Sequence, residues 1–160
     1  MYNQDEKFIK LAMKISRNSP ISSRKVGAVI VSGDNRVISS SANSLPMDEL
    51  PEEVGDINGD NAKKYWVEHA ERAAIFKATR QGIPLEGARI YATFFPCTSC
   101  MRAILQSGIT EVICPEPEFD HEKWGEEFYH SELMLRKSLA KFRVVRMDRH
   151  EHQCFEERGD

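Results

Sequence analysis

Two short motifs limit the possible folds most, because their side chains can act together only if the chain brings them together. His69 and Glu71 form a His-x-Glu motif, and Cys97 and Cys100 form a Pro-Cys-x-x-Cys motif. One imidazole and two thiolates are ligands of the kind a catalytic zinc site uses, with its fourth position open to water. Glu71 is not needed as a ligand, so we expect it to be the catalytic residue that moves protons for that water.

The spacing of the motifs supports this interpretation. Cysteines three residues apart share one face of a helix, so both sulfurs can reach one metal ion. Pro96 suits a helix start, where its missing N–H costs nothing. The positive end of that helix lowers the pKa of the Cys97 thiol toward the thiolate that binds metal. His69 and Glu71 point in different directions on a regular helix, so we expect the imidazole and the carboxylate to approach from different sides.

Other interpretations of the cysteine motif remain open. A Cys-x-x-Cys pair alone could be a redox pair or half of a structural zinc site. A structural site is closed by a fourth ligand, and the candidates are Cys114, His121, His130 and Cys154. The combination of both motifs in this order favours the catalytic site.

Length and composition predict one domain in a reducing compartment. The chain has 160 residues, of which 41% are hydrophobic, and a formal net charge of -3. We expect one domain over residues 1–160, with a core at about 5–147 and a charged tail at 148–160. No basic block marks a nucleic-acid surface. Cys114 and Cys154 are expected to be free thiols, which is typical of a cytoplasmic protein.

The ends and the hydropathy of the chain predict no membrane association. Residues 1–6 are polar and acidic, unlike a signal peptide. No apolar run approaches the length of a transmembrane helix. We therefore expect a cytoplasmic protein.

Patterned segments alternate along the chain and predict the secondary structure. Helices are expected at 3–17, 65–81, 97–106 and 124–139, and strands at 26–31, 36–41, 88–95, 111–114 and 142–147. The helix at 65–81 would carry His69 and Glu71 near its start. Gly27 inside the first strand predicts a close backbone approach. Residues 43–64 are expected to be irregular, either as a lid or effector site or as a disordered loop. This order predicts a mixed sheet between helices.

Several segments, taken together, resemble one known family. They are residues 25–31, 43–46 and 103–110, together with the two motifs. The sequence resembles the cytidine/deoxycytidylate deaminase superfamily over about residues 5–145, and within it most closely the deoxycytidylate (dCMP) deaminases. The resemblance implies an α/β fold, the cytidine deaminase-like three-layer sandwich with a five-stranded mixed sheet flanked by helices.

The resemblance also implies a reaction and a mode of control. Zn²⁺, one ion per chain, would be held by His69, Cys97 and Cys100, and dCMP would be hydrolysed to dUMP and ammonia, which supplies dUMP for dTMP synthesis. Glu71 would pass a proton from water to the cytosine ring and then to the leaving amino group. Many dCMP deaminases are hexamers, activated by dCTP and inhibited by dTTP. A homo-oligomer and nucleotide effectors, which could bring Mg²⁺, are therefore implied.

The sequence is also compatible with two other kinds of function. One is deamination of another cytosine, guanine or adenosine substrate, although the low basic charge disfavours RNA. The other is a non-catalytic zinc-binding scaffold, which would have no use for Glu71. A panel of substrates separates these possibilities.

The substrate contacts follow in part from the resemblance. By resemblance, Asn43 would bind the sugar or the base. The backbone of Ala70 and the turn at Pro96 could bond the pyrimidine edge. Phe94 or Phe95 could stack on the base, although aromatic residues of strands more often pack in the core.

Arg24 and Lys25 stand just before the first strand. Such charges usually lie on the solvated surface. Beside a site for a phosphorylated substrate, they become candidates for binding its phosphate.

The chain departs from the family pattern at three places. Ser41 and Ala42 stand where the family usually has Gly-Tyr, and Ala73 stands where Asn is frequent. Residues 44–64 contain no Cys or His, so the second zinc ion of some relatives is not expected.

Overall fold

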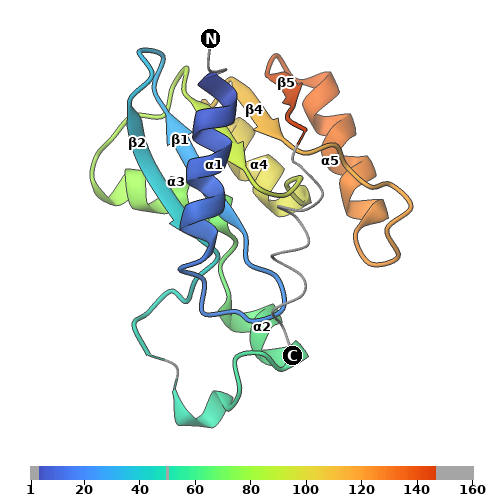
Figure 1. Ribbon diagram of the computed structural model, residues 1–160. Coiled ribbons are helices and arrows are strands. Elements are labelled where there is room, and N and C mark those ends of the chain that lie inside the picture. The colour runs from blue at the N-terminus through green and yellow to red at the C-terminus, as the bar shows by residue number, and fades with distance from the viewer. Residues whose placement is uncertain (1–3, 50, 147–160) are drawn as a thin grey trace.

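A five-stranded mixed sheet lies at the centre of the molecule, with the strand order β2-β1-β3-β4-β5 (Figure 1). The computed structural model describes residues 4–49 and 51–146, and only the backbone of residues 60 and 61. The strands are β1 (Gly27–Val31), β2 (Val37–Ala42), β3 (Arg89–Ala92), β4 (Glu111–Cys114) and β5 (Lys141–Val144). β1 pairs antiparallel with β2 and β3, whereas β3, β4 and β5 run parallel. The predicted mixed sheet is confirmed.

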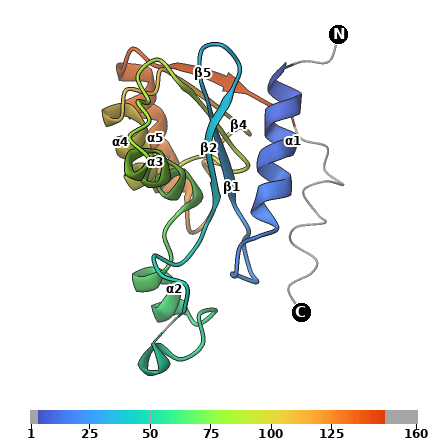
Figure 2. The same cartoon turned by 90° about the vertical axis from the view of Figure 1, so that its left-hand side faces the viewer.

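Helices cover both faces of the sheet. They are α1 (Gln4–Ser16), α2 (Asp60–Trp66), α3 (Ala70–Arg80), α4 (Thr98–Gln106) and α5 (Gly125–Lys137), with a short 3-10 turn, η1 (Glu52–Val54). α1 lies on one face, and α3, α4 and α5 lie on the other (Figure 2). The predicted three-layer sandwich is confirmed. The predicted tail at 148–160 lies outside the described residues. Within the described residues, no helix is long and apolar enough to cross a membrane.

β1 is buried on both faces, which explains its unbroken apolar sequence. Val29 and Val31 face α1, where they pack with Phe8 and Ala12. α1 approaches the sheet closely at Gly27, because a Cβ atom there would lie 2.0 Å from the carbonyl oxygen of Ala12. The predicted close approach at Gly27 is confirmed.

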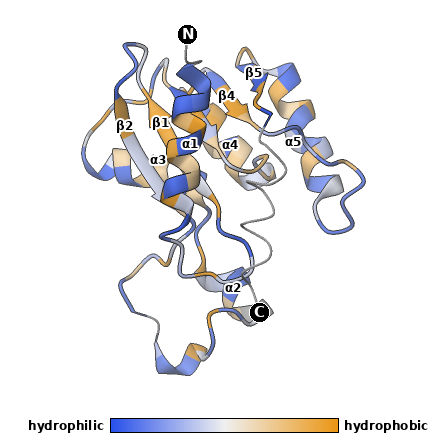
Figure 3. Cartoon of the chain, in the orientation of Figure 1, coloured by the Kyte–Doolittle hydropathy of each residue, from blue (hydrophilic) through white to orange (hydrophobic). Residues whose placement is uncertain are grey.

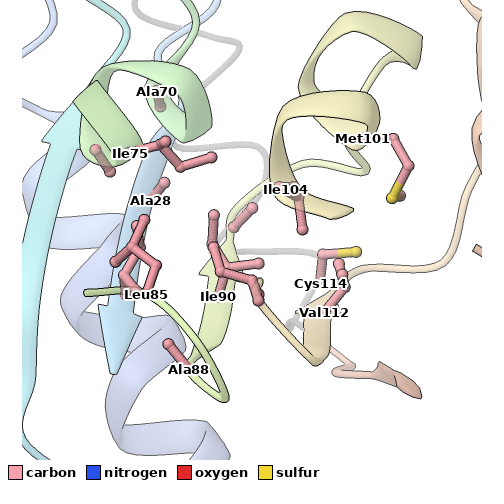
Figure 4. Close-up of a cluster of buried hydrophobic side chains, with 14 of the residues drawn as sticks. Ala28, Ala70, Ile75, Leu85, Ala88, Ile90, Met101, Ile104, Val112 and Cys114 are labelled. Atoms are coloured by element: carbon pink, nitrogen blue, oxygen red, sulfur yellow. The ribbon is translucent and has the colours of Figure 1, made fainter. Parts of the chain in front are cut away.

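The larger core lies between the sheet and helices α3 and α4 (Figure 4). Ala28 and Ile30 of β1 and Ile90 of β3 meet Met101 and Ile104 of α4, all fully buried. Burying each large side chain contributes about 1.5–3 kcal/mol. Apolar residues dominate β1 and β4, whereas polar and apolar residues alternate along α1 and α5 (Figure 3).

The prediction of one helix at 65–81 is wrong. α2 ends at Trp66 and α3 begins at Ala70, with extended backbone between them. The cause is a β-bridge, in which the N–H and C=O groups of Glu68 bond those of Ser44 at 2.8 and 3.0 Å. A residue bridged in this way cannot also bond within a helix. The predicted irregular stretch is also shorter than expected, because α2 begins at residue 60.

Further boundaries differ from the prediction: β5 ends at Val144, short of the predicted 147, and the ends of β3 and α5 also differ. β3 ends at Ala92, not at residue 95. The Thr93 N–H still bonds the carbonyl of Gly27 at 3.0 Å, but the N–H of Gly27 bonds the Thr93 hydroxyl at 3.0 Å, so the backbone ladder does not continue. α5 ends at Lys137, because the N–H of Ala140 bonds the Ser138 hydroxyl at 3.1 Å and closes a turn.

The segment between β2 and α3 projects from one end of the sheet in both views (Figures 1 and 2). Its outer part is tied to the segment before β1 by the side chains of Asn58 and Lys63. The Asn58 side chain accepts the N–H and hydroxyl of Ser22 at 2.9 and 2.8 Å. The Lys63 ammonium donates to the Ser23 hydroxyl at 2.6 Å. The projecting segment therefore holds the residues that lead into Arg24 and Lys25.

Candidate metal and catalytic site

His69 and Cys97 occupy equivalent positions, because each is the residue immediately before a helix. Both have extended backbone, with φ and ψ of -71° and 148° at His69 and -68° and 171° at Cys97. Their carbonyl groups accept the first helical hydrogen bonds of α3 and α4, from Ala73 at 2.9 Å and Met101 at 2.8 Å. The starts of both helices, which carry partial positive charge, therefore lie at the site. This differs from the prediction that His69 and Cys97 lie within helices.

The three predicted ligands come together. His69 Nδ1 lies 3.4 Å from Cys97 Sγ and 3.4 Å from Cys100 Sγ, and all three donor atoms lie within 4.8 Å of one another. Tetrahedral zinc, with bonds of about 2.3 Å to sulfur and 2.0 Å to nitrogen, places these atoms roughly 3.5 Å apart. The donor set and its spacing therefore fit a zinc ion.

None of the candidate fourth ligands that the structure describes joins this group. Cys114 is fully buried in the core, and burial raises the pKa of its thiol. His121 and His130 belong to the segment before α5 and to α5 itself, and Cys154 lies outside the described residues. Among the described residues, the arrangement is thus the three-ligand kind that leaves a position open.

Glu71 lies in the first turn of α3 and is 4% exposed. The Cys100 thiol donates to its Oε2 atom at 3.6 Å. Burial raises the pKa of the Glu71 carboxyl, so it can hold a proton closer to neutral pH than an exposed glutamate can. A group that can both take and return a proton beside the metal donors suits general acid–base chemistry.

The three candidate ligand side chains shift one another's pKa values. The hydrogen bond with Cys97 raises the pKa of His69 to about 9. The hydrogen bond from Cys100, followed by that from His69, lowers the pKa of Cys97 to about 4, against its burial. The pKa of Cys100 is raised, first by its hydrogen bond with Cys97 and then by burial. Cys97 is therefore the thiol that most readily becomes a thiolate ligand.

Asn43 uses its side chain to hold the segment before β1. It is 8% exposed, its oxygen accepts the N–H of Val26 at 2.9 Å, and its NH₂ donates to the carbonyl of Arg24 at 3.0 Å. An amide oxygen can accept a second hydrogen bond and an NH₂ can donate a second one. Its predicted contact with the sugar or base stays a prediction.

Arg24 is partly buried and lies on an aromatic ring, unlike a solvated surface charge. The centre of its guanidinium group is 4.3 Å from the centroid of the Phe94 ring, and its Nη2 atom is 3.5 Å from His121 Nε2. Lys25, the next residue, is partly buried. Binding of a phosphate by Arg24 and Lys25 stays a prediction.

Aromatic rings form one side of the site. Trp124 lies edge-on to His69, at 6.4 Å between ring centroids, and stacks on Phe128. Phe95 is 2% exposed and packs edge-on against Phe128 and Phe142 in the core. Phe95 thus follows the core alternative left open by the sequence, and its contact with a substrate stays a prediction, like those of Ala70 and Pro96.

Two residues near the site escaped the sequence analysis. Trp124 immediately precedes α5, and no motif marks it. Glu127 of α5 accepts the backbone N–H and the hydroxyl of Thr98 at 3.0 and 2.5 Å, and so fixes the first turn of α4 next to Cys97. These hydrogen bonds lower the pKa of Glu127. Both contacts join segments far apart in sequence, and no local pattern could have revealed them.

Comparison with known proteins agrees with the geometry. The family model described as the cytidine and deoxycytidylate deaminase zinc-binding region matches residues 2–116. An uncharacterized deaminase in the luxG 3′ region of Aliivibrio fischeri is 34% identical over 144 residues, which is 89% of this chain and 94% of that protein. Deoxycytidylate deaminase of Mus musculus is 30% identical over 142 residues, 86% of this chain and 77% of that protein. A probable deoxycytidylate deaminase of Drosophila melanogaster is 33% identical, and the match spans 57% of its length.

Solved structures share the fold. The dCMP deaminase of cyanophage S-TIM5 in its apo form has a TM-score of 0.66 at 22% identity, over 86% of this chain and 94% of that chain. Acinetobacter baumannii RibD has a TM-score of 0.61 at 20% identity, over 88% of this chain and 35% of that chain. The family match covers most of the described chain and includes all three candidate metal ligands. We conclude that the chain is a deaminase and belongs to the cytidine and deoxycytidylate deaminase family.

Proposed function

We propose that the protein, as one domain of residues 1–160, uses one Zn²⁺ per chain to hydrolyse dCMP to dUMP and ammonia. The observation that carries the proposal is the meeting of His69, Cys97 and Cys100, with buried Glu71 in contact with Cys100. The mouse relative is named a deoxycytidylate deaminase, which supports a cytosine nucleotide as the substrate. The product dUMP would serve the synthesis of dTMP.

In the proposed mechanism, three residues would bind the metal ion and a fourth would transfer protons. Zinc, held by His69, Cys97 and Cys100, would lower the pKa of a water molecule toward about 7 and so supply the nucleophile for C4 of cytosine. Glu71 would accept the proton of the attacking water and deliver it to ring N3. It would then take the proton of the new hydroxyl group at C4 and pass it to the amino group, which leaves as ammonia. Its raised pKa suits both directions of this transfer.

The substrate contacts are part of the proposal. Asn43 would bond the sugar or the base through the second hydrogen bonds that its amide oxygen and NH₂ group can still form beside those to Val26 and Arg24. The backbone of Ala70 and of the Pro96 turn would bond the pyrimidine edge, and Phe95 would support the base from the core side. Arg24 and Lys25 would bind the 5′-phosphate, because guanidinium–phosphate hydrogen bonds are charge-assisted.

Regulation and assembly extend the proposal by resemblance. We expect a homo-oligomer, a hexamer by analogy, in the cytoplasm, with dCTP as activator and dTTP as inhibitor. Among the described residues, the only group of side chains placed to hold a metal ion is the one at the candidate site. By the same resemblance, a nucleotide effector could bring Mg²⁺ with it. A sigmoidal dCMP curve that dCTP straightens and dTTP depresses would support this part, and indifference to both would remove it.

A substrate panel tests the reaction. The protein is offered dCMP, CMP, deoxycytidine, dCTP, cytosine and guanine, and turnover is followed by the ultraviolet spectrum, before and after chelation and after zinc is restored. The proposal expects dCMP to be the best substrate and turnover to need zinc. Guanine as the best substrate would refute the assignment, and a zinc-containing protein inert toward all six would favour the scaffold.

A substitution of Arg24 tests the assignment of the phosphate site. Arg24→Ala should reduce the preference for dCMP over deoxycytidine, because it removes a cation from the predicted phosphate site. Equal turnover of dCMP and deoxycytidine by the wild-type protein would refute the monophosphate assignment itself.

A further inference from the structure

His121 is fixed in one tautomer by its own turn. The backbone N–H groups of Lys123 and Trp124 both point at its Nδ1 atom, at 3.1 and 3.2 Å. A ring nitrogen that accepts hydrogen bonds carries no hydrogen, so a neutral imidazole here must carry its hydrogen on Nε2. His121 therefore presents an N–H donor on the side of the ring that faces away from the turn.

That donor faces another donor. His121 Nε2 lies 3.5 Å from Nη2 of Arg24, and every nitrogen of a guanidinium group is a donor. Neither group can accept from the other, so the contact is not a hydrogen bond between them. An anionic oxygen beside the pair can accept from both, and such charge-assisted hydrogen bonds are the strong kind.

The pair is held in place before any ligand arrives. The Arg24 guanidinium lies on the face of Phe94, with 4.3 Å to the ring centroid. The Arg24 carbonyl accepts from the buried Asn43 at 3.0 Å. The ring of His121 is oriented by the two backbone N–H groups of its turn. Preorganised donors lose little conformational entropy when they bind.

The pair also lies beside the candidate metal site. Trp124, whose N–H bonds His121, packs edge-on against His69 at 6.4 Å between ring centroids. Phe94, which carries the Arg24 guanidinium, lies three residues before Cys97. The segment 23–25 also receives the ammonium group of Lys63, at 2.6 Å from the Ser23 hydroxyl. Trp124 and Phe94 therefore connect the pair to His69 and to the segment that leads into Cys97.

We propose that His121, together with Arg24, binds the 5′-phosphate of the substrate and is a specificity-determining residue for a nucleotide over a nucleoside. This inference rests on the proposed function, and it assigns to His121 a role distinct from metal binding. With the base at the metal donors, one phosphate oxygen would accept from Nε2 of His121 and another from the Arg24 guanidinium.

The substitution His121→Asn separates the two roles of the histidine. The amide oxygen of asparagine can accept the N–H groups two and three residues on, as Nδ1 does, and so keeps the turn. It has no donor that reaches as far as Nε2. We expect kcat/KM for dCMP to fall about tenfold to a hundredfold, the value of one hydrogen bond to a charged group. The value for deoxycytidine should stay within about twofold.

Two further variants complete the series. His121→Asp keeps the acceptor for the turn but places a carboxylate beside Arg24, so it should impair dCMP more than His121→Asn does, and again spare deoxycytidine. His130→Asn is the matched control, because His130 is exposed on α5 and contacts Tyr129, and it should change neither substrate. Thermal unfolding of each variant identifies any change in folding, and the aspartate variant carries the same prediction if the asparagine variant is unstable.

Inhibition by product tests binding apart from catalysis. The inhibition constant of dUMP should rise in His121→Asn by the same factor as the loss with dCMP, while that of deoxyuridine stays unchanged. Equal losses for phosphorylated and unphosphorylated compounds would show that the histidine only maintains the turn, and would overturn the inference. An unchanged dUMP constant would overturn it as well. A wild-type protein that does not prefer dCMP to deoxycytidine would instead refute the proposed function, before any variant is compared.

Discussion

Gly27 provides a sharp test of how α1 is seated on the sheet. A Cβ atom at this position would lie 2.0 Å from the carbonyl oxygen of Ala12 and 2.9 Å from the backbone nitrogen of Ser16. Ordinary contacts begin near 3.4 Å, so α1 would have to move away by roughly 1.4 Å. Both contacts are to helix backbone, so no side-chain rotation can relieve them. We predict that Gly27→Ala lifts α1 and loosens its packing on β1.

The cost can be estimated from the residues that α1 buries. Phe8 and Ala12 fill the layer between α1 and the sheet, and separating such layers by more than an ångström forfeits much of their contact energy. Overpacking of this kind typically lowers the free energy of unfolding by about 1–3 kcal/mol. Because the clash is with rigid helix backbone, we expect the upper end of this range, about 3 kcal/mol. For a chain of this size, this lowers the melting temperature by about 6–12 °C.

Differential scanning calorimetry at equal zinc content measures this change. Gly33→Ala is the matched control, because a Cβ atom there meets nothing within 4 Å. It should leave the melting temperature unchanged or slightly raised, since alanine restricts the unfolded chain. The zinc content of Gly27→Ala should equal that of the wild type, because α1 lies on the face opposite α3 and α4 (Figure 2). A melting temperature of Gly27→Ala within about 2 °C of the control would refute the reasoning.

Three further predictions concern the site. Cys100→Ala should lose most of its zinc, as measured by metal analysis, because a three-ligand site cannot spare one ligand; full occupancy would contradict the ligand assignment. Glu71→Gln should keep its zinc and its melting temperature but lose about 100-fold or more in kcat, since proton transfer is separable from metal binding; wild-type turnover would exclude the proposed role. Glu127→Gln should lower stability by about 1 kcal/mol at pH 7, because it weakens the cap of α4 at Thr98. The folded protein holds the pKa of Glu127 below the ordinary 4.5, so the ionised carboxylate contributes its full stabilisation above that pH. The difference in the free energy of unfolding between wild type and Glu127→Gln should therefore shrink as the pH falls through the lower pKa of the folded protein. A constant difference between pH 7 and pH 3 would count against this prediction.

The metal donors could be predicted from sequence because each motif is local. His69, Cys97 and Cys100 are recognisable by type and spacing alone, and the alternation of β-branched and helical segments predicts the sheet and its layers. Gly27 was informative for the same reason, since glycine within a strand indicates a close neighbour whatever that neighbour is.

The features of the fold and the site that the sequence did not predict depend on contacts between distant segments. The break between α2 and α3 results from the bridge of Glu68 to Ser44, and helix propensity contains no information about that pairing. Trp124 and Glu127 reach the site only because α5 packs beside α4. The pairing of Arg24 with His121 joins residues 97 positions apart. None of these contacts leaves a periodic signal in the sequence.

The position of two ligands at helix starts has a consequence for the motions of the chain. The first turn of a helix has N–H groups without helical acceptors, so it is the part that opens most easily. His69 and Cys97 each form the junction between extended chain and helix, so an ion that binds both would clamp two junctions at once. Amide hydrogen exchange in residues 70–73 and 98–101 should therefore slow on addition of zinc, while the middle of α1 exchanges at its former rate. Metal binding at this site would thus reduce the fraying of the first turns of α3 and α4 together.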